Sequence, residues 1–186
     1  MNLFESPFAE VDARMIEVGQ LAYWQHYPEG DAIDKHGRYQ WYFHIHAPKS
    51  NKHASLHSVS AERGHIHLFA VEKRAGTVIA LRHLLAIGVA QSGMPRRLFT
   101  VNGWVTGDAP RSAHWSWRAL AALRLSTGHR DLDRFITETV KLYPREIKTL
   151  LRASDLKLRQ MGVDRASAAR NRRVEVLGSV LLSSTA

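Results

Sequence analysis

The chain has 186 residues, of which 45% are hydrophobic, 23% are charged and none is cysteine. This composition fits one folded domain with an ordinary core, and it excludes disulfides, thiolate metal sites, iron–sulfur clusters and cysteine nucleophiles. The formal charge is +9, and residues 141–186 carry 10 of the 26 Lys and Arg residues but only 4 of the 17 Asp and Glu residues. Such a basic surplus attracts nucleic acid, acidic proteins or anionic ligands, although a solvated helix face produces the same pattern.

The ends and the hydropathy of the chain give no sign of export or membrane insertion. Residues 1–5 (MNLFE) do not begin the basic and apolar segments of a signal peptide. The longest strongly apolar run, residues 84–90, is too short to cross a bilayer. We therefore expect a soluble, cytoplasmic protein with no membrane partner.

The first half of the chain predicts a helix followed by strands. Ser6 as N-cap, Pro7 in the first turn and an apolar helical period predict a helix over residues 7–26, followed by a polar loop at 27–38. Aromatic and β-branched runs then predict strands, and the short connections between the last three favour an antiparallel meander. The predicted strands are 39–47, 64–71, 77–90 and 96–106.

Beyond Pro110 the apolar period becomes helical. We expect the fold class α+β, with an antiparallel sheet of four or more strands over residues 39–107, an N-terminal helix and a C-terminal helical region over residues 112–181. Together these elements are predicted to form a single domain, 1–186. The helices expected in the C-terminal region are 112–125, 131–143, 145–161 and 164–181.

Two His-X-His segments on neighbouring predicted strands carry the strongest functional signal. Four of the 11 histidines belong to them: His44 and His46, and His65 and His67. Side chains alternate along a strand, so both imidazoles of each pair lie on one face. Symmetric closure of the connection would set His44 opposite His67 and His46 opposite His65, which brings four imidazoles together.

His83 and Glu62 are second choices for the same site. Pairing across the turn near residue 75 sets His83 opposite His67, and a bulge at Gly64 would turn Glu62 toward the histidine face. Imidazoles at this spacing suit Zn, Fe, Cu, Ni or Mn, with a carboxylate or water completing the shell. We therefore predict a histidine-rich metal-binding domain of unknown reaction, and a small metal-dependent enzyme is one form that it could take. Half-buried strand histidines with satisfied hydrogen bonds are the alternative.

Two further groups of residues are candidates. Asn102 and Trp104 share a face of the last predicted strand and are candidates to line a pocket beside the histidines. Arg170, Arg172 and Arg173 on the last predicted helix are candidates to bind an anion, nucleic acid or an acidic protein. A non-enzymatic binding module using these arginines is the alternative function, and an accessory subunit of another enzyme is a third.

Three segments together resemble a bacterial family of uncharacterised proteins that has similar HxH, GHxHxF and LFTVNxWVT motifs. They are residues 41–47 (WYFHIHA), 62–69 (ERGHIHLF) and 98–107 (LFTVNGWVTG). The resemblance covers residues 38–110 and extends to 164–177, and it implies no reaction. The HxH is also similar to that of cupins, but Ser50 and Asn51 stand where the glutamate of that motif belongs. The phosphate-loop, GxGxxG, HExxH and GxSxG motifs are absent from the sequence.

Overall fold

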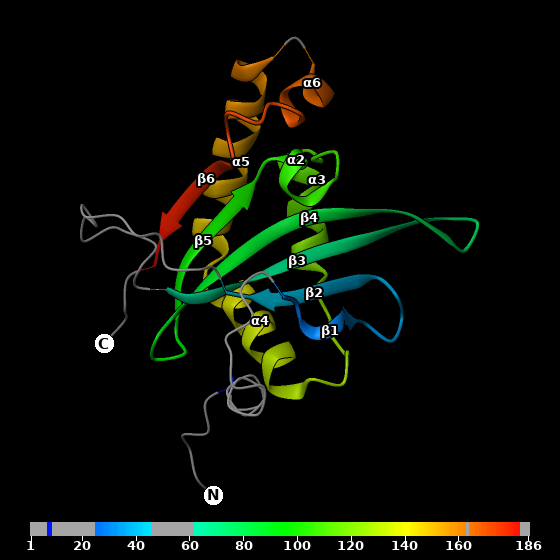
Figure 1. The fold of residues 1–186 in the computed structure, drawn as a ribbon, viewed down its shortest axis with the longest axis vertical. Coiled ribbons are helices and arrows are strands. Elements are labelled where there is room, and N and C mark those ends of the chain that lie inside the picture. The colour runs from blue at the N-terminus through cyan, green and yellow to red at the C-terminus, as the bar shows by residue number, and fades with distance from the viewer. Residues whose placement is uncertain (1–6, 9–24, 46–61, 163, 183–186) are drawn as a thin grey trace, which may run out of the picture.

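A computed structural model describes residues 7–8, 25–45, 62–162 and 164–182. The described chain is α+β, with one antiparallel sheet whose six strands follow in the order β1-β2-β3-β4-β5-β6 (Figure 1). The strands are β1 (Tyr27–Ile33), β2 (Tyr39–His44), β3 (Glu62–Arg74), β4 (Thr77–Ala90), β5 (Pro95–Val101) and β6 (Val176–Leu181). The helices are α2 (Gly103–Thr106), α3 (Ala113–Ala121), α4 (Arg130–Leu142), α5 (Pro144–Met161) and α6 (Arg165–Ala169). None of these described helices is long and apolar enough to cross a membrane.

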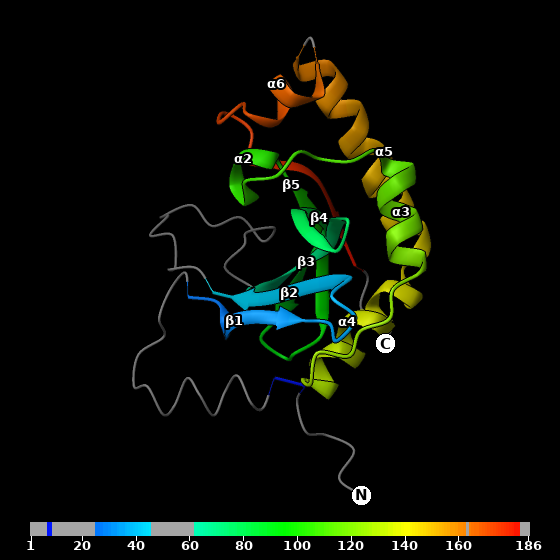
Figure 2. The same cartoon turned by 90° about the vertical axis from the view of Figure 1, so that its right-hand side faces the viewer.

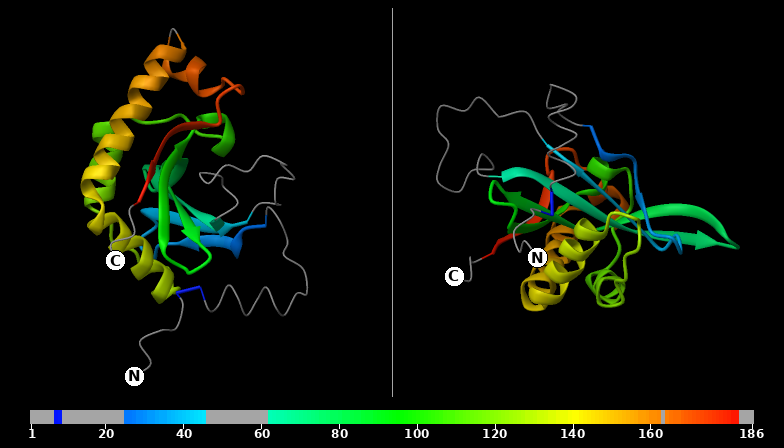
Figure 3. Two further views of the ribbon diagram at one scale, coloured as in Figure 1. Left: turned by 90° about the vertical axis from the view of Figure 1, so that its left-hand side faces the viewer. Right: turned by 90° about the horizontal axis from the view of Figure 1, so that it is seen from below.

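The main hydrophobic core lies between the sheet and one layer of helices. Figures 2 and 3 show α3, α4 and α5 on the same side of the sheet. Trp41, Ile66 and Leu85 of the strands and Ile136 and Leu150 of the helices belong to this core and are almost fully buried. Burying each such side chain contributes about 1.5–3 kcal/mol, which fixes the face that every strand turns toward the helices.

The predicted α+β class with an antiparallel sheet of four or more strands is confirmed, and the sheet has six strands. The bounds of β4 coincide with the predicted strand 77–90. The chain reverses just before it, where Ala75 and Gly76 have φ angles of 48° and 82°. Glycine reaches this left-handed region without steric cost, so Gly76 marks the turn in the sequence.

The predicted N-terminal helix is not supported by the residues that the structure describes. Residues 9–24 of the expected helix 7–26 lie outside them, residues 25–26 are not helical, and β1 begins at Tyr27 where a polar loop was expected. β1 pairs with β2 through an irregular register between Tyr27 and Ala32, and Gly30 and Asp31 have positive φ. This broken alternation, with its turn-forming residues, is typical of a loop in the sequence.

The predicted helix over residues 164–181 is wrong in its second half. The helix α6 is short, and Val176–Leu181 forms β6, which pairs with β5 at the edge of the sheet. A Cβ on Gly178 would lie 2.9 Å from side-chain atoms of both Leu150 and Ser154. The backbone of β6 therefore packs directly against α5, and this close approach explains the glycine.

Candidate metal centre

Alternation along β3 separates the histidines from the core. Ile66 and Leu68 point into the helix-facing core, and both are fully buried. His65 and His67 alternate with them and therefore point to the opposite face of the sheet. His44 shares that face, because it lies directly opposite His65 in the ladder between β2 and β3. The predicted common face for these three histidines is what the structure has.

The register between β2 and β3 differs by two residues from the prediction. His44 pairs with His65 rather than with His67, and Tyr42 is the partner of His67. A shift of two residues preserves the faces, whereas a shift of one would have reversed them. His46, the fourth predicted ligand, lies outside the described residues, as do His53 and His57 of the same connection.

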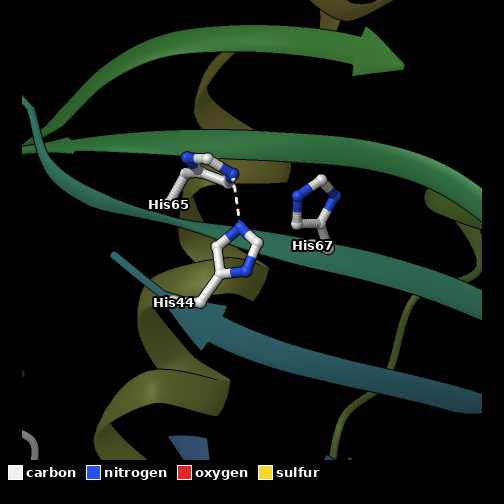
Figure 4. A group of neighbouring side chains, drawn as sticks. All are labelled: His44, His65 and His67. Atoms are coloured by element: carbon white, nitrogen blue, oxygen red, sulfur yellow. Dashed lines mark hydrogen bonds between the residues drawn. The ribbon is translucent and has the colours of Figure 1, made fainter. Parts of the chain in front are cut away.

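The three imidazoles converge (Figure 4). The ring centroids of His44 and His65 are 4.5 Å apart, those of His65 and His67 are 4.8 Å apart, and those of His44 and His67 are 5.2 Å apart. One nitrogen from each ring can be chosen so that all three lie within 4.8 Å of one another. The Nε2 atoms of His44 and His65 are already 2.7 Å apart. Donors around a tetrahedral zinc ion are about 3.3 Å apart for Zn–N bonds of about 2.0–2.1 Å, a spacing between the shortest and the longest of these nitrogen separations.

His83, on the neighbouring strand β4, contacts the histidine group through His67. It pairs with Phe69 in the ladder, not with His67 as predicted, because Arg74 pairs with Thr77 at the turn and the register shifts between Glu72 and Lys73. Its Nε2 nevertheless lies 3.0 Å from Nδ1 of His67. Burial lowers the pKa of His83 to about 3, so this ring is neutral at physiological pH. Its backbone N–H donates to the Asp108 carboxylate at 2.8 Å.

Glu62, the predicted carboxylate ligand, is engaged by an arginine. The pairing of β3 with β4 is irregular between Glu62 and Gly64, as the predicted bulge requires. The carboxylate accepts hydrogen bonds of 2.7 and 2.9 Å from Arg97 and occupies the space that a Cβ on Gly88 would need. Gly88 lies opposite His65, so the carboxylate is on the histidine face. It is not in the group of mutually close ligand atoms, which among the described residues consists of histidines.

Aromatic rings pack against the histidine group. The ring of Phe99 lies 5.1 Å from that of His65, and the ring of Tyr42 lies 5.2 Å from that of His67. Burial raises the pKa of Tyr42 to about 12, with a further contribution from the Asp31 carboxylate, so its phenol stays protonated. His65 and His67 are buried beneath these rings, and burial lowers the local dielectric and strengthens electrostatic interactions at the two imidazoles.

His26 is a neighbour of the site that the sequence did not indicate. Its ring stacks on Tyr42 at 3.6 Å between centroids with an interplanar angle of 7°, and it lies 5.8 Å from the ring of His44. Nδ1 of His26 is 2.8 Å from an Asp31 carboxylate oxygen. His26 falls at the end of the predicted helix 7–26, and no spacing in the sequence links it to the two His-X-His segments.

Asn102 and Trp104, the predicted pocket-lining residues, make their hydrogen bonds away from the three histidines. The strand ends at Val101, and Asn102 caps α2 by accepting a hydrogen bond from the Gly103 N–H. Asn102 is fully buried and Trp104 donates from Nε1 to the Val174 carbonyl at 2.8 Å. Both side chains thus contact the segment between α6 and β6, which lies within the predicted helix 164–181.

Arg170, Arg172 and Arg173 are exposed and lie in that same segment rather than on a helix. None of the three forms an ion pair with a carboxylate of the described chain. They belong to a surface that is distinct from the histidine group, and the two groups can be perturbed separately.

An antiparallel sheet with helices on one face and converging imidazoles on the other defines this chain as an α+β protein with a candidate metal centre. The chain belongs to the family described as domain of unknown function DUF6969, which it matches over residues 9–182. This membership agrees with the resemblance seen in residues 38–110, and it assigns no activity. No curated protein and no solved structure matches the chain.

Proposed function

We propose that this protein binds one transition-metal ion between His44, His65 and His67. The observation that carries the proposal is the convergence of three imidazole nitrogens within 4.8 Å of one another. Two adjacent, hydrogen-bonded strands supply all three rings, so the ligands are held by a rigid element rather than by separate loops.

The shortest contact in the group supports this position for the ion. The Nε2 atoms of His44 and His65 are 2.7 Å apart, a distance at which one nitrogen donates a proton and the other accepts it. A metal ion bound here would replace that hydrogen bond and accept a lone pair from each Nε2, with the donating ring carrying its proton on Nδ1 instead.

His83 is a positioning residue in this proposal. Its contact with Nδ1 of His67, at 3.0 Å, leaves Nε2 of His67 for the ion. A hydrogen bond to the second nitrogen of a ligating histidine fixes both its tautomer and its ring orientation. Because His83 is neutral, it accepts the Nδ1 proton of His67 without placing a second positive charge beside the metal.

Three imidazoles supply three ligands of a tetrahedral shell. The remaining position is filled by water, by a substrate or by another side chain of the protein. Neutral nitrogen donors suit Zn²⁺, Cu²⁺, Ni²⁺ and Fe²⁺, and Zn²⁺ is the first ion to test. An ion held by three histidines supplies Lewis acidity or an activated water, so we propose a small metal-dependent enzyme as the class to assay.

Elemental analysis and Zn²⁺ titration of untagged, full-length protein test the proposal. We expect uptake of about one equivalent per chain, with affinity read from competition against a chromophoric chelator. His65→Gln and His67→Gln should each weaken binding at least about 100-fold, and His83→Gln by about 10–100-fold. The matched control is His114→Gln, because His114 is exposed on α3 in the helical layer.

Two results would overturn this function. One is failure of the folded wild-type chain to take up Zn²⁺, Cu²⁺, Ni²⁺ or Fe²⁺. The other is equal loss of affinity in the His114→Gln control and in the His65→Gln variant, which would place the ion on surface histidines.

A further inference from the structure

The buried side-chain amide of Asn102 helps to hold the segment that joins α6 to β6. Asn102 is fully buried, and its Nδ2 lies 3.1 Å from the carbonyl oxygens of Ala168 and Asn171 and 3.2 Å from that of Val174. Its Oδ1 accepts from the Gly103 N–H. Figures 1 and 2 show α2 beside α6 and the connection that follows it. One side chain thus ties this connection to the end of β5, and a fully satisfied buried amide makes it rigid.

The connection held in this way presents positive charge. Arg170, Arg172 and Arg173 are exposed, and Arg170 interacts electrostatically with the Asp164 carboxylate. Arg172 and Arg173 form no ion pair within the part of the chain that the structure describes. The exposed Glu175 follows them before β6. The local surplus is therefore positive and rests mainly on Arg172 and Arg173.

An aromatic ring lies at the same place. Trp104 is 36% exposed, although tryptophan is usually largely buried, and its Nε1 donates to the carbonyl of Val174, directly after the arginine pair. The hydrogen bond fixes the indole at the turn, so little conformational entropy is lost when a ligand contacts it. Val105, next to Trp104, is also 36% exposed.

We propose that the surface formed by Arg172, Arg173 and Trp104 binds single-stranded nucleic acid. Guanidinium groups pair with backbone phosphates, and an exposed indole stacks on a base of any sequence. An acidic protein would use the charges but would have no specific need for a fixed aromatic ring. The rigid turn held by Asn102 sets the spacing of the arginines before the ligand arrives.

Fluorescence anisotropy of a labelled 12-nucleotide single-stranded RNA, measured against salt concentration, tests this surface on the full chain. The Arg172→Ala/Arg173→Ala variant should lose at least about tenfold in affinity, and the slope of log K against log salt should fall by about 1.4 for two lost phosphate contacts. The matched control is Arg145→Ala/Arg152→Ala, which removes the same charge from exposed positions of α5. Equal losses in the two variants would show general charge attraction and overturn the proposal.

The role of the indole separates nucleic acid from other anions. Trp104→Ala should weaken RNA binding about tenfold, and Trp104→Tyr should restore most of it, because tyrosine keeps a stacking ring. Glu175→Gln removes the nearby acid and should strengthen binding. Polyglutamate or inorganic phosphate competing as well as unlabelled RNA, or Trp104→Ala binding like the wild type, would contradict the proposal.

Discussion

Replacing Glu62 by Gln distinguishes a structural carboxylate from a metal ligand. The substitution keeps the shape of the side chain but removes the charge that Arg97 binds through two hydrogen bonds. The side chains of Glu62 and Arg97 are only 4% and 15% exposed. Loss of the carboxylate charge therefore leaves the guanidinium poorly solvated and without its counterion.

The expected cost follows from this burial. Removing one partner of a buried ion pair costs about 3–5 kcal/mol, chiefly because the other charge stays buried. The guanidinium of Arg97 also lies 4.1 Å from the centre of the Phe99 ring, and this contact persists in the variant. We therefore expect the lower end, a loss of about 3 kcal/mol in the free energy of unfolding. For a chain of this length that lowers the melting temperature by about 9 °C.

Urea denaturation followed by tryptophan fluorescence measures this loss, and Zn²⁺ titration of the same variant should show nearly unchanged affinity. Combining Glu62→Gln with Arg97→Gln should reveal a coupling energy of about 2 kcal/mol or more. The control is Glu138→Gln, because Glu138 pairs with Lys141 at an exposed site and should cost less than about 0.5 kcal/mol. A collapse of metal affinity in Glu62→Gln with little loss of stability would refute the reasoning and make Glu62 a ligand.

Three further predictions concern single residues. Burial lowers the pKa of His83 from its usual 6.5 to about 3, so the unfolded chain takes up this proton first as pH falls. The metal-free protein should lose about 1.4 kcal/mol of stability per pH unit below pH 6.5 from this group, and an unchanged slope in His83→Gln would contradict the assignment. Asn102→Ala removes the amide that contacts three carbonyls and the Gly103 N–H, and it should lower the free energy of unfolding by about 2–4 kcal/mol. A loss of less than about 0.5 kcal/mol in urea denaturation would contradict this role of Asn102. Gly88→Ala should lower the free energy of unfolding by about 2 kcal/mol because the new methyl group displaces the Glu62 carboxylate, and by much less in a Glu62→Ala background. Thermal melts that show an equal loss of stability in both backgrounds would contradict this packing.

The common face of the histidines could be predicted because alternation survives errors in register. The expected pairing of His44 with His67 was wrong by two residues, yet both side chains stayed on the same side of the sheet. The pairing of His83 with His67 failed differently, because irregular register between β3 and β4 cannot be read from the spacing. The imidazole of His83 reaches His67 all the same, through ring orientation rather than through strand pairing.

The elements at both edges of the sheet could not be predicted from local patterns. β6 has Val176, Leu177 and Val180 at spacings that also fit an amphipathic helix, and only its pairing with β5 decides between the two. Asn102 gave no sign of its role, because the three carbonyls that it contacts belong to residues 66 to 72 positions later in the chain. Contacts of this kind depend on tertiary structure and leave no local signal.

The most direct test of the metal centre is X-ray absorption spectroscopy of the Zn²⁺-loaded, untagged full chain. We expect about three imidazole nitrogens at about 2.0–2.1 Å from the zinc ion, and one fewer imidazole in His65→Gln. A shell made mainly of oxygen, or a spectrum that His65→Gln leaves unchanged, would contradict a metal ion between His44, His65 and His67.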